Sequence, residues 1–177
     1  MRSSTTPPLA SSQLSQELIP SVPGEFYSYS ATFTFELPLY PLLKCKANKT
    51  WGPEDLPGIA AELDLVFCFG DSPQVCSPNS DQAAGLLRGF VTRDALNQTF
   101  IIRVNMAEHE FERIRTARNG RNLADFCEEV VNYRNSVDQL EQGAVYAVVT
   151  TSGKYGLIRI TNLTPNSASI DACHTLL

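Results

Sequence analysis

The sequence predicts an α+β domain, in which a mainly antiparallel β-sheet carries an inserted helical pair. Three observations predict this fold class. Apolar and polar residues alternate from residue 27, helical periodicity is concentrated in residues 105–131, and β-branched runs return after residue 143. Strands, then a helical pair, then strands again are typical of α+β domains.

Length and composition are those of one globular domain. The 177 residues include 43% hydrophobic and 19% charged residues, which is ordinary for a folded protein. We predict a flexible tail rich in Ser, Thr and Pro over residues 1–25, whose composition buries little apolar surface. A single α+β domain is predicted over residues 26–177. The net charge of −5 disfavours a nucleic-acid partner, because phosphate binding needs clustered Lys and Arg.

The sequence leaves the location of the protein open. No run approaches the roughly 20 apolar residues of a membrane helix, so no membrane-spanning segment is predicted. The tail lacks the continuous apolar centre of a secretory signal. The protein is therefore secreted or in the cell envelope if a signal was removed from it, and otherwise cytoplasmic.

Alternating residues predict the first strands. In residues 27–39 every odd position is apolar, whereas the even positions from 28 to 36 are Ser, Ser, Thr, Thr and Glu. A period of two is typical of a strand with one buried face. Residues 62–69 alternate in the same way, which predicts that Glu62 and Asp64 lie on a solvated outer face. Residues 99–104 are β-branched and aromatic and predict a third strand.

Two helices are predicted after the third strand. Asn105 can cap the first, with Glu108 three residues later, an arrangement close to a capping box. An Asn122 cap and a stripe of apolar residues at helical spacing predict the second. The stripe, expected to face the core, consists of Leu123, Phe126, Cys127, Val130 and Val131.

The C-terminal part of the chain predicts strands over residues 144–150, 155–163 and 167–172. The turn TTSGKYG between the first two contains Gly153, which suits a hairpin turn with a positive φ. A phosphate-binding loop would instead lead from a strand into a helix. Because a second β-branched run follows the turn, we interpret it as a hairpin.

The five cysteines indicate no metal site, because none forms the close Cys-x-x-Cys pair typical of zinc clusters. Cys68 and Cys76 could close a small disulfide ring if the compartment is oxidising. Cys127 lies on the apolar stripe and is expected to be a buried thiol.

The sequence predicts no catalytic residue and no cofactor. His109 is expected on a charged helix surface, and His174 in a terminal segment that frays. No nucleophile elbow surrounds any serine or cysteine. The candidate ligand-binding residues are Trp51, on a long loop, and Tyr155, in the hairpin. Aromatic residues on loops are frequent binding anchors, although a loop aromatic packed over the core is commoner.

The hairpin resembles a family. Its sequence VYAVVTTSGKYGLIRITNL is similar to a signature of exported bacterial β-rich domains, including haem-binding surface lipoproteins of the HmuY type. The matching residues are Tyr146, Val148, Thr150, Gly153, Lys154, Tyr155, Ile158, Arg159 and Ile160. The resemblance implies an exported, β-dominated, non-enzymatic domain. That family's haem-binding histidine pair does not align with His109 and His174, so we predict no haem held by two histidines.

The sequence therefore predicts a non-catalytic binding or envelope-associated module with an unknown protein or small-molecule partner. Two alternatives stay open. One is a small hydrolase or transferase that uses cysteine or carboxylate groups around the loop between Cys68 and Cys76. The other is a structural subunit of a larger assembly. Titratable groups that converge in a deep pocket would favour the enzyme.

Overall fold

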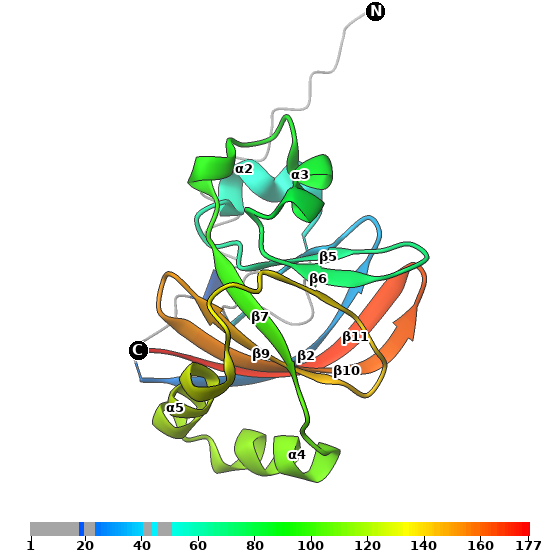
Figure 1. Cartoon of the computed structure of the whole chain (residues 1–177). Helices are drawn as coiled ribbons and strands as arrows, with labels where there is room; N and C mark the ends of the chain where they lie inside the picture. Colours follow the sequence, from blue (N-terminus) through cyan, green and yellow to red (C-terminus); the bar gives the residue numbers. More distant parts are fainter. Residues whose placement is uncertain (1–17, 20–23, 41–43, 46–50) are drawn as a thin grey trace, which may run out of the picture.

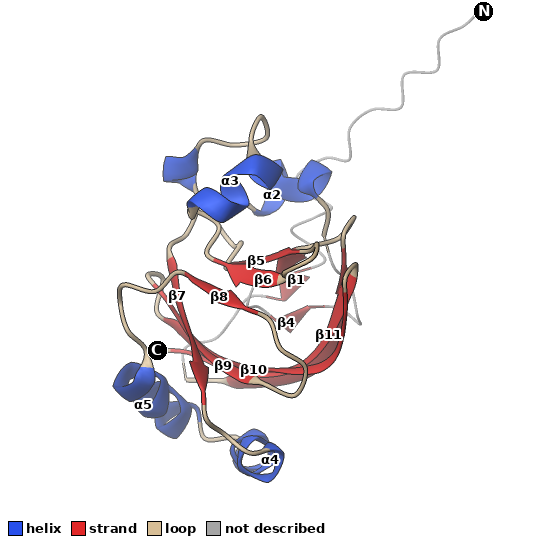
Figure 2. Ribbon diagram, turned by 45° about the vertical axis from the view of Figure 1, so that its right-hand side comes forward, coloured by secondary structure: helices blue, strands red, loops and turns tan. Residues whose placement is uncertain are grey.

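The computed structural model describes residues 18–19, 24–40, 44–45 and 51–177. Two antiparallel sheets face each other, and helices lie on the outer side of each (Figure 1). Helices α4 and α5 cover the larger sheet, while α2 and α3 cover the smaller one (Figure 2). The predicted α+β class with a mainly antiparallel sheet is confirmed.

The larger sheet has five strands in the order β2-β11-β10-β9-β7. They are β2 (Phe26–Thr34), β7 (Thr99–Val104), β9 (Val145–Thr150), β10 (Lys154–Thr164) and β11 (Ser167–Leu176). The first strand is shorter than predicted: it ends at Thr34, and Phe35 beyond it is 62% exposed. The last strand is longer than predicted, because residues 173–176 continue to pair with β10.

The smaller sheet has the order β3-β5-β6-β8. Its strands are β3 (Leu39–Tyr40), β5 (Leu65–Cys68), β6 (Gln74–Cys76) and β8 (Val137–Gln139), and a separate pair is formed by β1 (Leu18–Ile19) and β4 (Lys44–Cys45). β1 falls inside the predicted flexible tail and pairs with β4. Apart from residues 18–19 and 24–25, that tail lies outside the described residues.

The helices include the predicted pair. They are α2 (Leu56–Ile59), α3 (Asp81–Leu87), α4 (Glu108–Ala117) and α5 (Gly120–Val130), with 3-10 turns η1 (Pro53–Asp55) and η2 (Arg93–Ala95). Within the part of the chain that the structure describes, no helix combines the length and the apolar character needed to cross a membrane.

Both predicted caps of the helical pair are wrong by two or three residues. The carboxylate of Glu110 accepts a hydrogen bond from the N–H of Ala107, at 2.8 Å, so α4 begins at Glu108 rather than after Asn105. The side chain of Asn119 accepts from the N–H of Asn122, at 3.1 Å. Asn119 therefore caps α5, and Asn122 lies inside its first turn.

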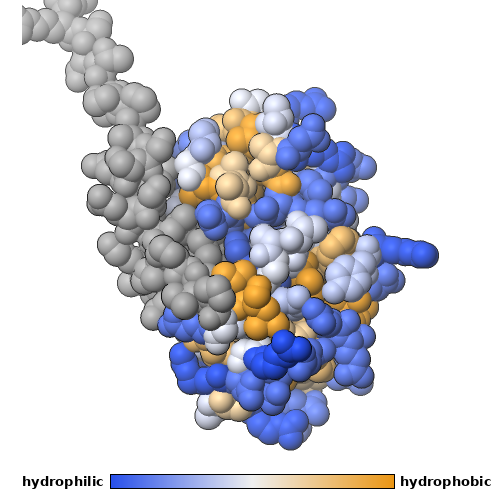
Figure 3. Space-filling model, turned by 90° about the vertical axis from the view of Figure 1, so that its left-hand side faces the viewer, coloured by the Kyte–Doolittle hydropathy of each residue, from blue (hydrophilic) through white to orange (hydrophobic). Residues whose placement is uncertain are grey.

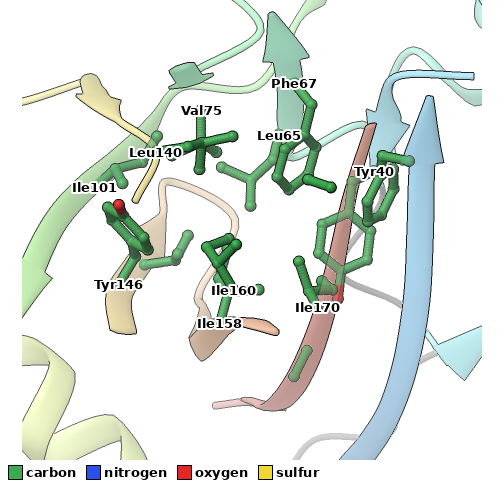
Figure 4. Packing of buried hydrophobic residues seen from close by; sticks show 14 of the residues in the cluster. Tyr40, Leu65, Phe67, Val75, Ile101, Leu140, Tyr146, Ile158, Ile160 and Ile170 are labelled. Carbon is green, nitrogen blue, oxygen red and sulfur yellow. The ribbon is translucent and has the colours of Figure 1, made fainter. Parts of the chain in front are cut away.

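Three apolar clusters fill the spaces between the layers. The first lies between the two sheets, where Phe67 and Val75 of the smaller sheet meet Tyr146 and Ile158 of the larger one (Figure 4). The second lies under α4 and α5 and includes Leu123 and Cys127 of the predicted stripe. The third lies between the smaller sheet and α2 and α3. The larger sheet is consequently buried on both faces over much of its area.

The predicted hairpin joins β9 to β10 and is confirmed. Gly153 has a φ of +81°, and its N–H donates to the carbonyl of Thr150 at 3.1 Å. Residues other than glycine rarely adopt this φ. A Cβ atom at this position would also lie 3.1 Å from the carbonyl oxygen of Leu177.

We expect Gly153→Val to lower the free energy of unfolding by about 1–2 kcal/mol, because a β-branched residue is strained at a positive φ. Chemical denaturation of the two proteins measures the difference. Ser152→Val is the matched control, since Ser152 is the exposed neighbour in the same turn. Equal stability of Gly153→Val and the parent protein would contradict the expectation.

Candidate functional site

The structure places Trp51, a candidate ligand-binding residue, in the core. Its side chain is 1% exposed and packs in the cluster beneath α2, with Leu56 and Leu63 among its members. Its carbonyl accepts a hydrogen bond from the N–H of Leu39, at 3.1 Å. Trp51 therefore joins its loop to the smaller sheet, which is the commoner role of a loop aromatic.

Tyr155, the second candidate, is half-buried on the outer face of β10. Its hydroxyl donates to the Glu128 carboxylate of α5 at 2.7 Å. This hydrogen bond, with some burial, raises the pKa of Tyr155 to about 12. The phenol thus links α5 to the sheet and stays protonated at neutral pH.

The four cysteines whose side chains are described fall into two pairs. Cys68 and Cys76 lie on the neighbouring strands β5 and β6 with their sulfurs 3.6 Å apart, and both are free thiols. Cys127 and Cys173 are buried together under α5. Burial raises the pKa of each of these two to about 12, so they are protonated and unreactive at neutral pH.

The two histidines lie on opposite sides of the larger sheet. His109 is exposed on α4, as predicted. The prediction for His174 is wrong. This residue lies within β11 and pairs with β2 on one side and β10 on the other. Its side chain is fully buried between the two sheets. Its ring stacks on Tyr27 at 5.0 Å between centroids and meets Tyr29 edge-on at 5.6 Å.

Alternation along β11 keeps Cys173 and His174 apart. Cys173 joins the cluster under the helices, while His174 points to the opposite face. The strand geometry therefore excludes a nucleophilic pair made of these two neighbours. Burial, and then the charge of Lys154, lower the pKa of His174 to about 3, so its ring is neutral at pH 7.

A buried ion pair joins two strands where the sequence predicted a solvated face. Asp64, expected in solvent, is 0% exposed, and Lys154 is 5% exposed. The Nζ atom of Lys154 lies 2.8 and 3.1 Å from the two carboxylate oxygens of Asp64, and 3.6 Å from Glu62 at the rim. One signal in the sequence indicates that Lys154 is buried. Alternation along β10 places its side chain on the same inward face as Ile158 and Ile160.

A polar hollow of about 460 Å³ lies on the outer face of β2, β10 and β11. We call it the hydroxyl hollow. Its lining side chains on this face are Ser30, Thr32, Thr161, Ser169 and Asp171. The alternate Ser and Thr residues of the first predicted strand supply two of them. The hollow begins where the helices stop covering the sheet.

Charges at the edge of the hydroxyl hollow compensate one another. Asp171 accepts a hydrogen bond from Ser30 and lies 3.5 and 3.8 Å from the guanidinium groups of Arg115 and Arg159. Arg159 also pairs with Glu108 of α4, at 2.8 Å. Across the strands, the hydroxyls of Thr32 and Ser169 lie 3.0 Å apart. The hollow thus presents neutral hydroxyls beside a cluster of ion pairs.

Two further hollows are smaller. One, of about 200 Å³, lies beside α3 between Ser80 and Leu96, and the other, of about 300 Å³, lies between α4 and α5. The surface in Figure 3 carries separate hydrophobic areas among hydrophilic residues. Among the described residues, no group of three or more His, Cys, Asp or Glu side chains is placed to hold a metal ion.

Comparison with known proteins identifies a similar fold and no family. No family model and no curated protein matches the chain. A crystal structure of a DUF4466 family protein from Parabacteroides merdae is similar, with a TM-score of 0.57 and 17% sequence identity. The match covers 86% of this chain and 54% of that one, so the chain spans about half its length. At this identity the likeness shows the fold alone.

Proposed function

We propose that this protein is a non-catalytic binding module whose ligand occupies the hydroxyl hollow. The observation that carries the proposal is the hollow itself, an open volume of about 460 Å³ lined by hydroxyl groups and one carboxylate. The ligand class that fits is a neutral molecule rich in hydroxyl groups, such as a monosaccharide.

Hydrogen-bonding capacity supports this ligand class. A hydroxyl both donates and accepts hydrogen bonds. The pairs Thr32–Ser169 and Ser30–Asp171 use only part of that capacity. A ligand hydroxyl can therefore add to each pair without leaving a protein group unpaired. Ligands with matching donors and acceptors lose little hydrogen bonding when they displace water.

The paired charges support a neutral ligand. The two cations Arg115 and Arg159 are paired with the three anions Asp171, Glu108 and Glu112. An added anion or cation would meet a like charge within this group and would compete with an existing ion pair. A neutral polar molecule meets neither cost.

The placement of the titratable groups supports binding rather than catalysis. Asp64, Lys154 and His174 are at most 5% exposed, so they do not face the hydroxyl hollow or any other open surface. Asp171, which does face it, is held by two guanidinium groups and a hydroxyl. Both of its carboxylate oxygens are therefore already engaged by neighbouring groups.

We expect titration of neutral monosaccharides into ¹⁵N-labelled protein to shift the amide resonances of Ser30, Thr32 and Ser169 saturably. The expected affinity is on the order of millimolar, because the hollow is open and its lining has no aromatic ring for a sugar to stack on. The corresponding sugar acids should give weaker shifts, because an added carboxylate meets the like charge of Asp171.

Two matched variants test the position of the site. Ser169→Leu should remove the shifts, because the larger apolar side chain fills the hollow. Ser167 lies two residues away on the same face of β11 but outside the hollow. Ser167→Leu should therefore leave the shifts unchanged. The proposal fails if no monosaccharide gives a saturable shift, or if both variants weaken it equally. The exported location stays a prediction, which fractionation of the source cells would check.

A further inference from the structure

The thiols of Cys68 and Cys76 meet on the side of the smaller sheet that faces α3. Cys68 lies opposite Gln74, and Cys76 lies opposite Val66, so the two cysteines are diagonal neighbours on adjacent antiparallel strands. Diagonal side chains on one face of a sheet lie within reach of each other. Their sulfurs are 3.6 Å apart, against about 2.05 Å in a disulfide.

The two thiols have different surroundings. Cys76 is fully buried, and its S–H donates toward the sulfur of Cys68. Cys68 is the last residue of β5 and is partly exposed. The hydrogen bond from Cys76 lowers the pKa of Cys68, and the same interaction raises that of Cys76. A thiol that is both accessible and easily ionised is the one that reacts first.

We propose that Cys68 and Cys76 form a reversible thiol–disulfide pair, in which Cys68 reacts first with a small-molecule disulfide and Cys76 completes the exchange. This inference is independent of the hydroxyl hollow, which lies on the other sheet. It assigns the pair a redox chemistry that the other described cysteines lack, because both Cys127 and Cys173 are fully buried and neither offers an accessible sulfur to a disulfide.

The exchange is balanced with one molecule of a disulfide, RSSR. The thiolate of Cys68 attacks one sulfur of RSSR, the S–S bond breaks, and RS⁻ leaves, which gives a mixed disulfide on Cys68. Cys76 then attacks the sulfur of Cys68, the second RS⁻ leaves, and the proton of Cys76 ends on an RS⁻ group. The two thiols are oxidised to one disulfide, and RSSR is reduced to two RSH.

The local backbone allows the sulfurs to close. Cys68 ends β5 at the turn of the short β5–β6 hairpin, and the turn residues Gly70, Asp71 and Ser72 are exposed. An approach of roughly 1.5 Å between the sulfurs is required, by comparison with the bond length of a disulfide. A side-chain rotation at Cys68, whose sulfur lies 3.9 Å from the carbonyl oxygen of Gln82, can supply part of it.

The test exposes the folded, reduced full chain to oxidised glutathione, stops the reaction with acid and maps the thiols by mass spectrometry. Trypsin releases Cys68 and Cys76 on one peptide, residues 50–88, whereas Cys45, Cys127 and Cys173 fall on three others. The parent protein should lose two hydrogens on that peptide and hold no lasting glutathione there. Reduced glutathione in excess should reverse the change.

Single variants separate the roles of the two thiols. Cys76→Ser should accumulate one glutathione on Cys68, while Cys68→Ser should leave Cys76 unmodified. Cys127→Ser, a buried cysteine outside the pair, should behave as the parent does. The inference is overturned if the parent keeps glutathione on Cys68, if peptide 50–88 does not react, or if Cys76 reacts in Cys68→Ser as fast as Cys68 does in Cys76→Ser.

Discussion

Lys154→Met is expected to lower the free energy of unfolding by about 3–5 kcal/mol, several times the effect of losing an exposed ion pair. The variant removes the ammonium group that lies 2.8 Å from the buried Asp64 carboxylate. Removing one partner of a buried ion pair leaves a charge that is costly to keep out of water. Urea denaturation at pH 7 measures the loss.

A double variant separates the charge effect from the packing effect. Asp64→Leu with Lys154→Met replaces both charges by apolar groups and should recover most of the lost stability, because such replacements are often neutral. Arg93→Met is the exposed control: its pair with Asp81 is 58% and 85% exposed, and its loss should cost less than about 1 kcal/mol. If Lys154→Met also lowered the free energy of unfolding by less than about 1 kcal/mol, the expected role of the buried pair would be contradicted.

Because of His174, the free energy of unfolding is expected to be about 2 kcal/mol lower at pH 5 than at pH 7. Burial keeps the folded ring neutral down to a pKa of about 3, whereas the ring of the unfolded chain binds a proton below about 6.5. The unfolded state therefore gains protons first as the pH falls. The contribution of His174 is complete above about pH 6.5 and is lost progressively toward about pH 3.

His174→Phe should remove this pH dependence, because a phenyl ring can occupy the space beside Tyr27 and does not titrate. It should also be at least as stable as the parent at pH 5, since neither imidazole nitrogen has a hydrogen-bond partner among the described residues. His109→Gln is the control, because it replaces the other histidine, which is exposed. This variant should keep the pH dependence of the parent's stability. Parallel stability curves for the parent and His174→Phe between pH 7 and 5 would disprove the expectation.

Local patterns were sufficient for much of the fold. The glycine in TTSGKYG and the β-branched runs beside it predicted the hairpin, because turn chemistry and strand propensity act over a few residues. The stripe that includes Leu123 and Cys127 predicted the face of α5 that meets the sheet. These features depend on neighbours in the sequence, so the sequence alone reveals them.

The errors concern residues whose surroundings come from distant parts of the chain. Asp64 was expected in solvent because alternation usually separates a wet face from a dry one, but Lys154 of β10, 90 residues away in the sequence, pairs with its buried carboxylate. His174 was expected to fray, but β2 supplies a partner strand from the other end of the chain. The hydroxyl hollow likewise joins Thr32 to Ser169, which are 137 residues apart.

The position of β11 between β2 and β10 has a consequence for the order in which the fold can assemble. Within the larger sheet, β2 hydrogen-bonds only to β11, and β11 follows every other strand in the sequence. At the synthesis rates of roughly 5–20 residues per second, β2 leaves the ribosome on the order of ten seconds before its partner. Tyr27 and Phe33 then lack the strand that shields them. Completion of this sheet therefore waits for the synthesis of β11 and requires closure of a long loop, which is slow compared with local contacts.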